Sequence, residues 1–331
     1  MSIASTKRMN ILASSLAAIL FVTSSSTAQV PITDIAISPK GESYVFVSQK
    51  GLSVVKAKAS SSNQSVFTIV KHAKNKELPT SNLHALSFSP DGKRLLVCGG
   101  RPSESAFLGV YSWPRLVPLE TLTIAGDSLL TAIWVSDSQI ATGGLDTNVR
   151  ILDANSLTVT HVLGGHSNGI TSMALIKPSR LLISAGLDNS LRIWSLEDYS
   201  LVRSLNQHIH PVLDVASQIP KEGLPIVASA SEDRTIRFWQ PTIGRMVRFI
   251  KLPAKPQSIN WVGENILAAA CDNGQLYIID TLNVETVGSR QLKTGWCYDT
   301  ERGPAKYQLV ITGANGVIES VSVPTILSES P

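Results

Sequence analysis

Apolar runs alternate with polar turns in a pattern that recurs along the chain. Four stretches, 140–153, 182–195, 227–240 and 267–280, each contain an apolar run, a polar turn with Asp and a second, alternating run. This pattern predicts a β-hairpin in each stretch. The turn residues Asp146, Asp188, Asp233 and Asp272, the last with a slip of one residue, lie 42, 45 and 39 residues apart. These intervals match the length of one four-stranded propeller blade.

Further apolar strands are predicted upstream, at 32–37, 83–88, 129–134, 170–175, 212–217 and 258–262. The first two run into 38–41 and 89–92, where Pro presets a turn and Gly supplies a positive φ. A weaker seventh unit spans 295–323 and turns at Asn315-Gly316. The sequence therefore predicts an all-β fold, a single β-propeller of seven four-stranded blades, with six or eight blades as the alternatives.

Two of the repeats resemble the WD-repeat family closely. Blade four has His166, Ser184, Asp188 and Trp194 at the family's positions, and blade five has His208, Ser229, Asp233 and Trp239. The resemblance implies that each set is a structural tetrad, hydrogen-bonded within its blade, and that these His residues are not catalytic. Blade three keeps Asp146 but has Thr142 for the Ser, Leu152 for the Trp and no His, and blade six keeps only Asp272.

The first 28 residues have the features of a leader. Lys7 and Arg8 precede an apolar run of 12 residues at 11–22, followed by small residues at Ser26 and Ala28. This order is typical of a secretory signal peptide, and the run is shorter than the ~20 residues of a membrane-spanning helix. We therefore expect a signal peptide at 1–28 cleaved near Ala28, a propeller at 29–331, and an exported (periplasmic or extracellular) bacterial-type protein with no stable membrane anchor.

The charge distribution argues against nucleic-acid binding. The formal net charge of +4 falls to +2 without Lys7 and Arg8. The nearest approach to a basic cluster is Lys71, His72, Lys74 and Lys76, closed by Glu77, which we interpret as a solvated loop.

No cofactor, metal site or catalytic set is predicted. Cys98, Cys271 and Cys297 are odd in number and lie in apolar stretches, which favours buried free thiols. No zinc-ligand spacing, nucleophile elbow or phosphate-binding loop occurs in the sequence. The turn Asp residues recur once per blade, where their first role is to bond the local backbone. We therefore expect a protein that is not an enzyme.

Three Arg residues, Arg150, Arg192 and Arg237, occupy one equivalent position in blades three to five. Either they line a channel that binds anions, or each pairs with a turn carboxylate; the second interpretation is favoured. Among the Trp residues, Trp134, Trp194, Trp239 and Trp261 are predicted to be core, and Trp113 is the candidate for an exposed aromatic anchor.

The function implied by the family is that of a scaffold, a monomeric propeller that binds a protein or peptide partner within a complex. The binding loops would display Arg101, Ser103, Glu104, Asn168, Asn189, Glu232 and Arg234 on one face. The alternative is a propeller enzyme or small-ligand binder, such as a lactonase-like hydrolase or sugar-binding protein, acting at a channel that contains Asp34, His84 and Asp214.

Closure of the ring is the last open point. If cleavage follows Ala28, either 324–327 completes blade seven or that blade stays three-stranded. If the leader is retained, 16–23 is the alternative closing strand.

Overall fold

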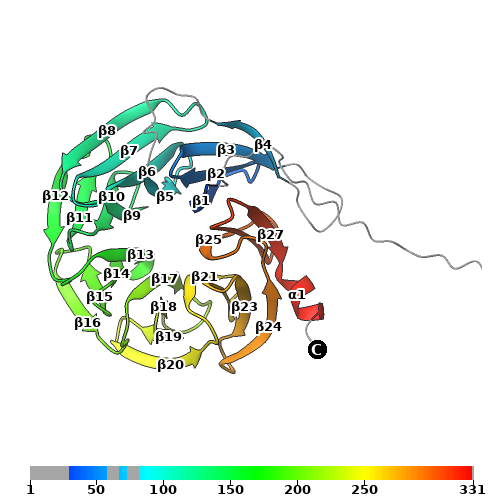
Figure 1. The fold of residues 1–331 in the computed structure, drawn as a ribbon. Coiled ribbons are helices and arrows are strands. Elements are labelled where there is room, and N and C mark those ends of the chain that lie inside the picture. Colours follow the sequence, from blue (N-terminus) through cyan, green and yellow to red (C-terminus); the bar gives the residue numbers. More distant parts are fainter. Residues whose placement is uncertain (1–29, 58–66, 73–81, 330–331) are drawn as a thin grey trace, which may run out of the picture.

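In the computed structural model, residues 30–57, 67–72 and 82–329 are described. Within these ranges, seven antiparallel sheets stand side by side in a closed ring (Figure 1). Six sheets have four strands and one has three, each connected in sequence order. The predicted all-β propeller with seven blades is therefore confirmed, and the six- and eight-bladed alternatives are excluded.

The strands of the first four blades follow the chain in order. Blade one contains β1 (Ile32–Ile37), β2 (Ser43–Ser48), β3 (Gly51–Ala57) and β4 (Phe67–His72). Blade two contains β5 (Leu83–Phe88), β6 (Arg94–Arg101), β7 (Ser105–Ser112) and β8 (Pro118–Ala125). Blade three contains β9 (Leu129–Trp134), β10 (Gln139–Gly144), β11 (Val149–Asp153) and β12 (Val159–Leu163). Blade four contains β13 (Ile170–Ile176), β14 (Leu181–Gly186), β15 (Leu191–Ser195) and β16 (Leu201–Leu205), with a short 3-10 helix at Lys177–Ser179.

The last three blades complete the ring. Blade five contains β17 (Val212–Gln218), β18 (Ile226–Ser231), β19 (Thr235–Gln240) and β20 (Arg245–Lys251). Blade six contains β21 (Pro256–Trp261), β22 (Ile266–Cys271), β23 (Gln275–Asp280) and β24 (Glu285–Gln291). Blade seven contains β25 (Cys297–Arg302), β26 (Gln308–Gly313) and β27 (Ile318–Ser322), followed by the helix α1 (Val323–Glu329).

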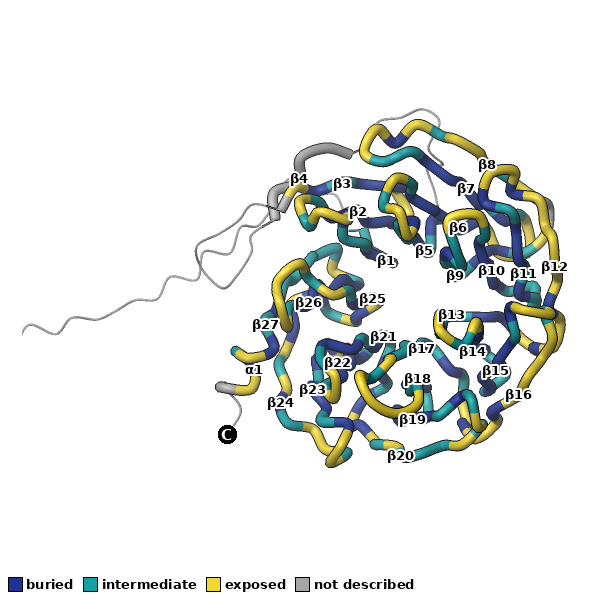
Figure 2. The backbone as a smooth tube through the Cα atoms, turned by 180° about the vertical axis from the view of Figure 1, so that it is seen from behind, coloured by how far each residue is buried: buried dark blue, intermediate teal, exposed yellow. Residues whose placement is uncertain are grey.

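The core lies between neighbouring blades and not in one central cluster. The second strand of a blade is the most buried, as in β14, where all six residues are buried, whereas four of the five residues of the outermost strand β12 are exposed. Figure 2 shows this gradient from the buried middle of each blade to its exposed rim. Trp194 of blade four packs against Ile151 and Leu163 of blade three. Each blade thus buries its apolar face on the next.

The innermost strands share one irregularity. In every blade the register between the first and second strands shifts at the second residue of the first strand, for example between Ile32 and Asp34 and between Val212 and Asp214. A bulge of this kind re-aims the side chains that follow it. The third residue of the strand is therefore available to contact the neighbouring blade.

Blade seven closes the ring without a fourth strand. Among the described residues, no strand pairs with the outer edge of β27. Of the two alternatives for a chain without the leader, the three-stranded blade is the one found, and the strand at 324–327 is not, because these residues belong to α1, which lies beside β24 and β27 (Figure 1). Val323 and Ile326 of α1 are buried in a cluster with Leu292 and Val321. The alternative closing segment, 16–23, lies outside the described residues.

The basic cluster starts inside a strand. Lys71 and His72 are the last two residues of β4, so the interpretation of the whole cluster as a loop is wrong. Lys74 and Lys76 lie outside the described residues. In the described part of the chain, no helix is long and apolar enough to cross a membrane.

Candidate functional site

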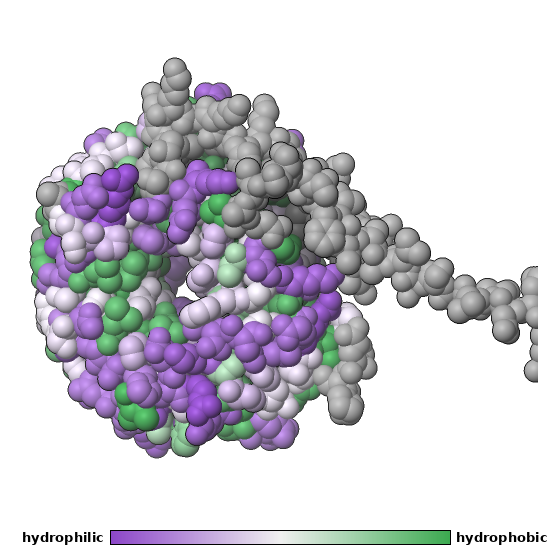
Figure 3. All heavy atoms as spheres, viewed as in Figure 1, coloured by the Kyte–Doolittle hydropathy of each residue, from purple (hydrophilic) through white to green (hydrophobic). Residues whose placement is uncertain are grey.

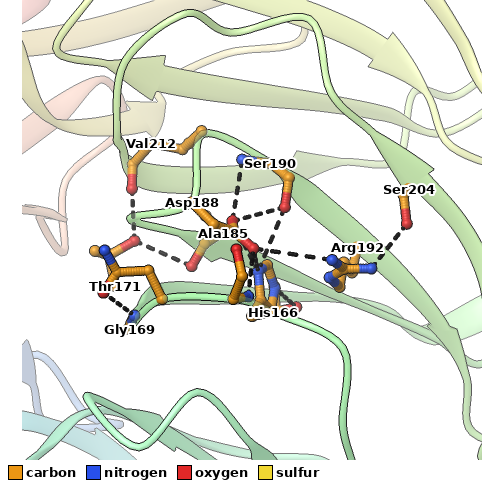
Figure 4. A network of polar contacts seen from close by, with 12 residues as sticks. His166, Gly169, Thr171, Ala185, Asp188, Ser190, Arg192, Ser204 and Val212 are labelled. Atoms are coloured by element: carbon orange, nitrogen blue, oxygen red, sulfur yellow. Dashed lines mark hydrogen bonds and ion pairs between the residues drawn. The ribbon is translucent and has the colours of Figure 1, made fainter.

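A hydrogen-bonded tetrad connects the loop before blade four to the core of that blade, and Figure 4 shows its His166 and Asp188 with the polar residues around them. The indole Nε1 of Trp194 donates to the Ser184 hydroxyl at 2.9 Å, and His166 Nε2 lies 2.7 Å from the same oxygen. His166 Nδ1 lies 3.0 Å from both carboxylate oxygens of Asp188. Asp188 also accepts from the Ser167 backbone N–H, so one carboxylate holds the loop, the turn and the imidazole together.

Blade five repeats this arrangement. Ser229 accepts from Trp239 Nε1 at 2.8 Å and lies 2.8 Å from His208 Nε2, while His208 Nδ1 lies 2.8 Å from Asp233. Burial lowers the pKa of His208 despite the neighbouring carboxylate, so the imidazole is neutral at physiological pH. Burial opposes ionisation of Asp233, but hydrogen bonds from Thr235 and His208 lower its pKa to about 2. In both tetrads the polar side-chain atoms are bonded to partners in the same blade or its entry loop. This arrangement supports a structural role for the tetrads.

The three equivalent Arg residues pair with the turn carboxylates. Arg192 Nη2 lies 3.9 Å from Asp188, Arg237 Nη2 lies 3.7 Å from Asp233, and Arg150 forms an ion pair with Asp146. None of the three lines the cavity at the centre of the ring. The structure therefore supports turn pairing over an anion channel.

The predicted partner-binding residues share one face of the ring, which we call the upper face. It is the face on which each innermost strand begins, and it carries the turns between second and third strands. Arg101, Ser103 and Glu104 are exposed in the turn of blade two, where Arg101 and Glu104 form an ion pair of 3.0 Å. Asn168 of blade four and Arg234 of blade five are exposed, whereas Asn189 and Glu232 are half-buried. Blade three separates the two groups, so they do not form one cluster.

The exposed aromatic side chains of the upper face do not include Trp113, the residue predicted to be an exposed anchor. Trp113 is half-buried, with its ring 5.0 Å from that of Phe88, so it is not an exposed anchor. Trp296 and Tyr298 are instead 49% and 39% exposed, and their rings stack with centroids 6.5 Å apart. They flank the buried Cys297 at the start of β25. The four Trp residues predicted to be core are buried, as are the three free Cys residues.

The centre of the ring contains a cavity of about 380 Å³, visible as a hollow in Figure 3. Its wall includes four carboxyl groups from the innermost strands, those of Asp34, Asp214, Asp299 and Glu301. The sequence interpretation identified the first two and missed the others, because blade seven lacks the repeat signal that would have aligned them. His84 does not line this cavity.

Most of these carboxyl groups are engaged in contacts between blades. Asp34 accepts from the backbone N–H of Leu86 at 2.6 Å, Asp214 from that of Ile259 at 2.8 Å, and Asp299 from that of Ile35 at 3.2 Å. In each pair the acceptor is the third residue of one innermost strand and the donor is the fourth residue of the next. This repetition favours a structural role for the three Asp residues over the alternative of a channel enzyme.

The environment of the channel favours protonated carboxyl groups. Burial raises the pKa of Asp214 to about 6 and that of Glu301 to about 8, with the charge of Asp299 contributing to both. Burial and mutual proximity raise the pKa of Asp34 well above its usual range, and burial also raises that of Asp299. Among the described residues, no group of three His, Cys, Asp or Glu side chains is placed to hold a metal ion.

Comparison with known proteins agrees with this architecture. The family model described as "WD domain, G-beta repeat" matches residues 157–195 and 199–240, which contain the two tetrads. The chain is 28% identical over 171 residues to WD repeat-containing protein 37 of Mus musculus, covering 51% of this chain and 34% of that protein. It thus spans about a third of that relative.

Two further relatives also match this chain. Identity is 26% over 162 residues with COMPASS component SWD3 of Saccharomyces cerevisiae, covering 48% of this chain and 49% of that protein. Identity is 25% over 240 residues with methylosome protein WDR77 of Xenopus laevis, covering 66% and 71%. Together with the seven-bladed ring, these matches support a WD-repeat β-propeller.

Removing the shared hydroxyl of the first tetrad is expected to destabilise the protein. Ser184→Ala leaves the Trp194 N–H without its acceptor in a buried position, and we expect a loss of about 1–3 kcal/mol in the free energy of unfolding. Urea denaturation measures this loss. Ser289→Ala, at an exposed Ser on β24 outside this network, is the matched control and is expected to change stability by less than about 0.5 kcal/mol. Equal losses in both variants would contradict the structural role of the tetrad.

The raised pKa of Glu301 predicts a pH-dependent loss of stability. The folded state binds the Glu301 proton more tightly than the unfolded state does. The resulting contribution to the free energy of unfolding is therefore fully present below the unfolded-state pKa and is lost as pH rises towards 8. Glu301→Gln removes the loss. We expect the variant to gain about 1–2 kcal/mol relative to the wild type between pH 5 and pH 9, after allowance for solvent in the channel. Denaturation at both pH values tests this, with Glu285→Gln at an exposed site as the control; a gain independent of pH would contradict it.

Proposed function

We propose that this chain is a scaffold that binds a protein or peptide partner on its upper face and performs no catalysis there. The observation that carries the proposal is a set of exposed apolar side chains on loops that the blades hold in place. Ile209 is 71% exposed, and its backbone N–H lies 3.4 Å from the tetrad residue Asp233. Trp296 is anchored by the buried Cys297, and its carbonyl accepts from the Ala314 N–H. Aromatic side chains on ordered loops are typical binding hot spots, because little entropy is lost on binding.

The names of the relatives support partner binding. One is named as a component of COMPASS and another as a methylosome protein, so each name places its protein in an assembly. We extend partner binding, and not any particular partner, to this chain. The propeller would act as a monomer within such a complex, and nucleic acid is not the proposed partner.

We also propose that the protein is exported, with 1–28 as a cleaved signal peptide. This part of the proposal rests on the leader pattern alone, since residues 1–29 lie outside the described part of the chain. Intact mass of the protein expressed in a host with a secretory pathway is expected to correspond to a chain that begins at Gln29. A secreted or cell-associated protein that still begins at Met1 would contradict cleavage.

Truncation of the exposed Trp is expected to weaken partner binding. We expect Trp296→Ala to lower recovery of a specific partner by at least roughly tenfold, because a hot-spot residue contributes about 2 kcal/mol or more. Quantitative affinity capture from the native host compares this variant with the wild type. The control is Leu282→Ala, because Leu282 is 60% exposed in the turn between β23 and β24, on the opposite face.

The two variants separate the outcomes. Both are first shown by circular dichroism and thermal unfolding to be folded like the wild type. A partner lost with Leu282→Ala but retained with Trp296→Ala would place binding on the opposite face. Equal recovery of the partner with the wild type and both variants would show that Trp296 is not part of the binding surface.

A further inference from the structure

Blade three has the backbone of a tetrad blade without the two aromatic rings. Thr142 lies opposite Arg150, as Ser184 lies opposite Arg192, and Leu152 lies opposite Ile140, as Trp194 lies opposite Leu182. The loop that enters blade three consists of residues 126–128 and contains no His. Asp146 and Arg150 keep the ion pair that Asp188 and Arg192 form in blade four. Blade three therefore keeps the hydroxyl, carboxylate and guanidinium groups of a tetrad blade, whereas the indole and the imidazole are missing.

A cavity occupies this position. It measures about 240 Å³, and Thr142, Asp146, Arg150 and Leu152 all line it. Apolar side chains of blade two, including Leu108 and Leu122, form the facing wall. Ile124 and Val159, which also line it, are 43% and 39% exposed, so the cavity reaches the surface between blades two and three. The cavity is therefore open at the rim of the ring.

We propose that this cavity binds a neutral, indole-sized aromatic group that carries a hydrogen-bond donor. In blades four and five the equivalent space holds an indole whose N–H donates to the Ser hydroxyl at 2.9 and 2.8 Å. Here the Thr142 hydroxyl stands at the Ser position and the Asp146 carboxylate at that of the tetrad Asp, so both kinds of acceptor are retained. The proposal does not depend on partner binding at the upper face.

Size and charge narrow the class of ligand. A closed apolar cavity of about 150 Å³ is large enough to bind benzene, so a cavity of about 240 Å³ suits a two-ring group. Arg150 pairs with Asp146, and Asp127, the second carboxylate in the wall, accepts from the backbone N–H groups of Ser103 and Ser128. Each charged group of the wall is thus already partnered within the protein, which favours a neutral ligand over an ion. A guanidinium group beside the cavity also favours an aromatic ring, because it can stack on the ring face.

Blades two and six do not offer the same site. In blade two the fully buried Tyr111 lies opposite Leu95, at the position of the tetrad Trp, and so fills the space with its own ring. In blade six Ala269 lies opposite Tyr277, at the position of the tetrad Ser, and provides no hydroxyl. The combination of a retained hydroxyl and a lost indole distinguishes blade three from both.

The test measures binding of indole and of indene, which has the same shape but no N–H, to the full chain by calorimetry. Wild type is expected to bind indole more tightly than indene. Leu152→Trp restores the tetrad indole and is expected to weaken indole binding at least roughly tenfold, since it removes the space. The matched control is Val202→Trp, which adds the same side chain at a 41% exposed site on β16 of blade four, outside the cavity, and is expected to leave binding unchanged.

Thr142→Val tests the polar contact while preserving shape. It is expected to weaken indole binding roughly 2- to 12-fold, the equivalent of one hydrogen bond, and to leave indene binding unchanged. If Leu152→Trp does not fold, the comparison of indole with indene in Thr142→Val still tests the proposal. Absence of indole binding to the wild type, unchanged binding in Leu152→Trp, or equal effects of Thr142→Val on the two probes would overturn the proposal.

A third probe distinguishes the source of the aromatic group. N-acetyltryptophanamide carries the indole on a peptide-like backbone. Binding of both this probe and indole supports a Trp side chain of a partner as the ligand. Binding of indole alone supports a free small molecule, because the mouth of the cavity then excludes the backbone.

Discussion

The ring depends on hydrogen bonds that cross from one innermost strand to the next. Strands pair only within their own sheet, so no ladder of main-chain bonds joins neighbouring blades. A bulge after the first residue of each innermost strand re-aims the third residue, and in four of the seven blades the side chain of that residue accepts from the backbone of the next blade. Asp34 reaches Leu86, Asp214 reaches Ile259, Asp299 reaches Ile35, and Ser258 accepts from the backbone N–H of Thr300 at 3.1 Å. The junction between blades seven and one, which has no shared strand, uses the same contact as the junctions between blades one and two, five and six, and six and seven.

This way of joining blades determines the chemistry of the channel. A carboxylate can accept from a backbone N–H and from a side chain at once, as Asp214 does with Ile259 and Ser172. The cost is that several carboxyl groups converge where solvent is limited, so their pKa values rise and some remain protonated. Such a group resembles a catalytic acid in its pKa alone. The contacts of Asp34, Asp214 and Asp299 show that the perturbation accompanies assembly, which is why perturbed groups are only probabilistic evidence of an active site.

The sequence predicted features that repeat and missed those that occur once. The hairpins around Asp146, Asp188 and Asp233 carry period-two alternation and a turn signal, so blades three to five could be drawn from the sequence. Both tetrad sets could be assigned because the same four residue types recur at matching spacing. Asp299 had no such support, and Trp296 differs from Trp113 only in how the neighbouring chain packs. The sequence left open whether 324–327 forms a fourth strand or blade seven stays three-stranded; in the structure Val323 and Ile326 pack as part of a helix on blades six and seven.

Departures from the repeat are therefore the informative positions. A complete tetrad satisfies its polar atoms internally and leaves little room for a ligand, as the burial of His166, Ser184 and Trp194 shows. Replacing Trp by Leu while retaining Thr142 and the Asp146–Arg150 pair leaves the polar groups in place around unfilled space. Close packing makes an empty apolar space costly, so a blade that retains one loses stability that the neighbouring blades keep. Blade four, the next blade along the ring, has a complete tetrad, so the missing indole and imidazole are a local departure in blade three.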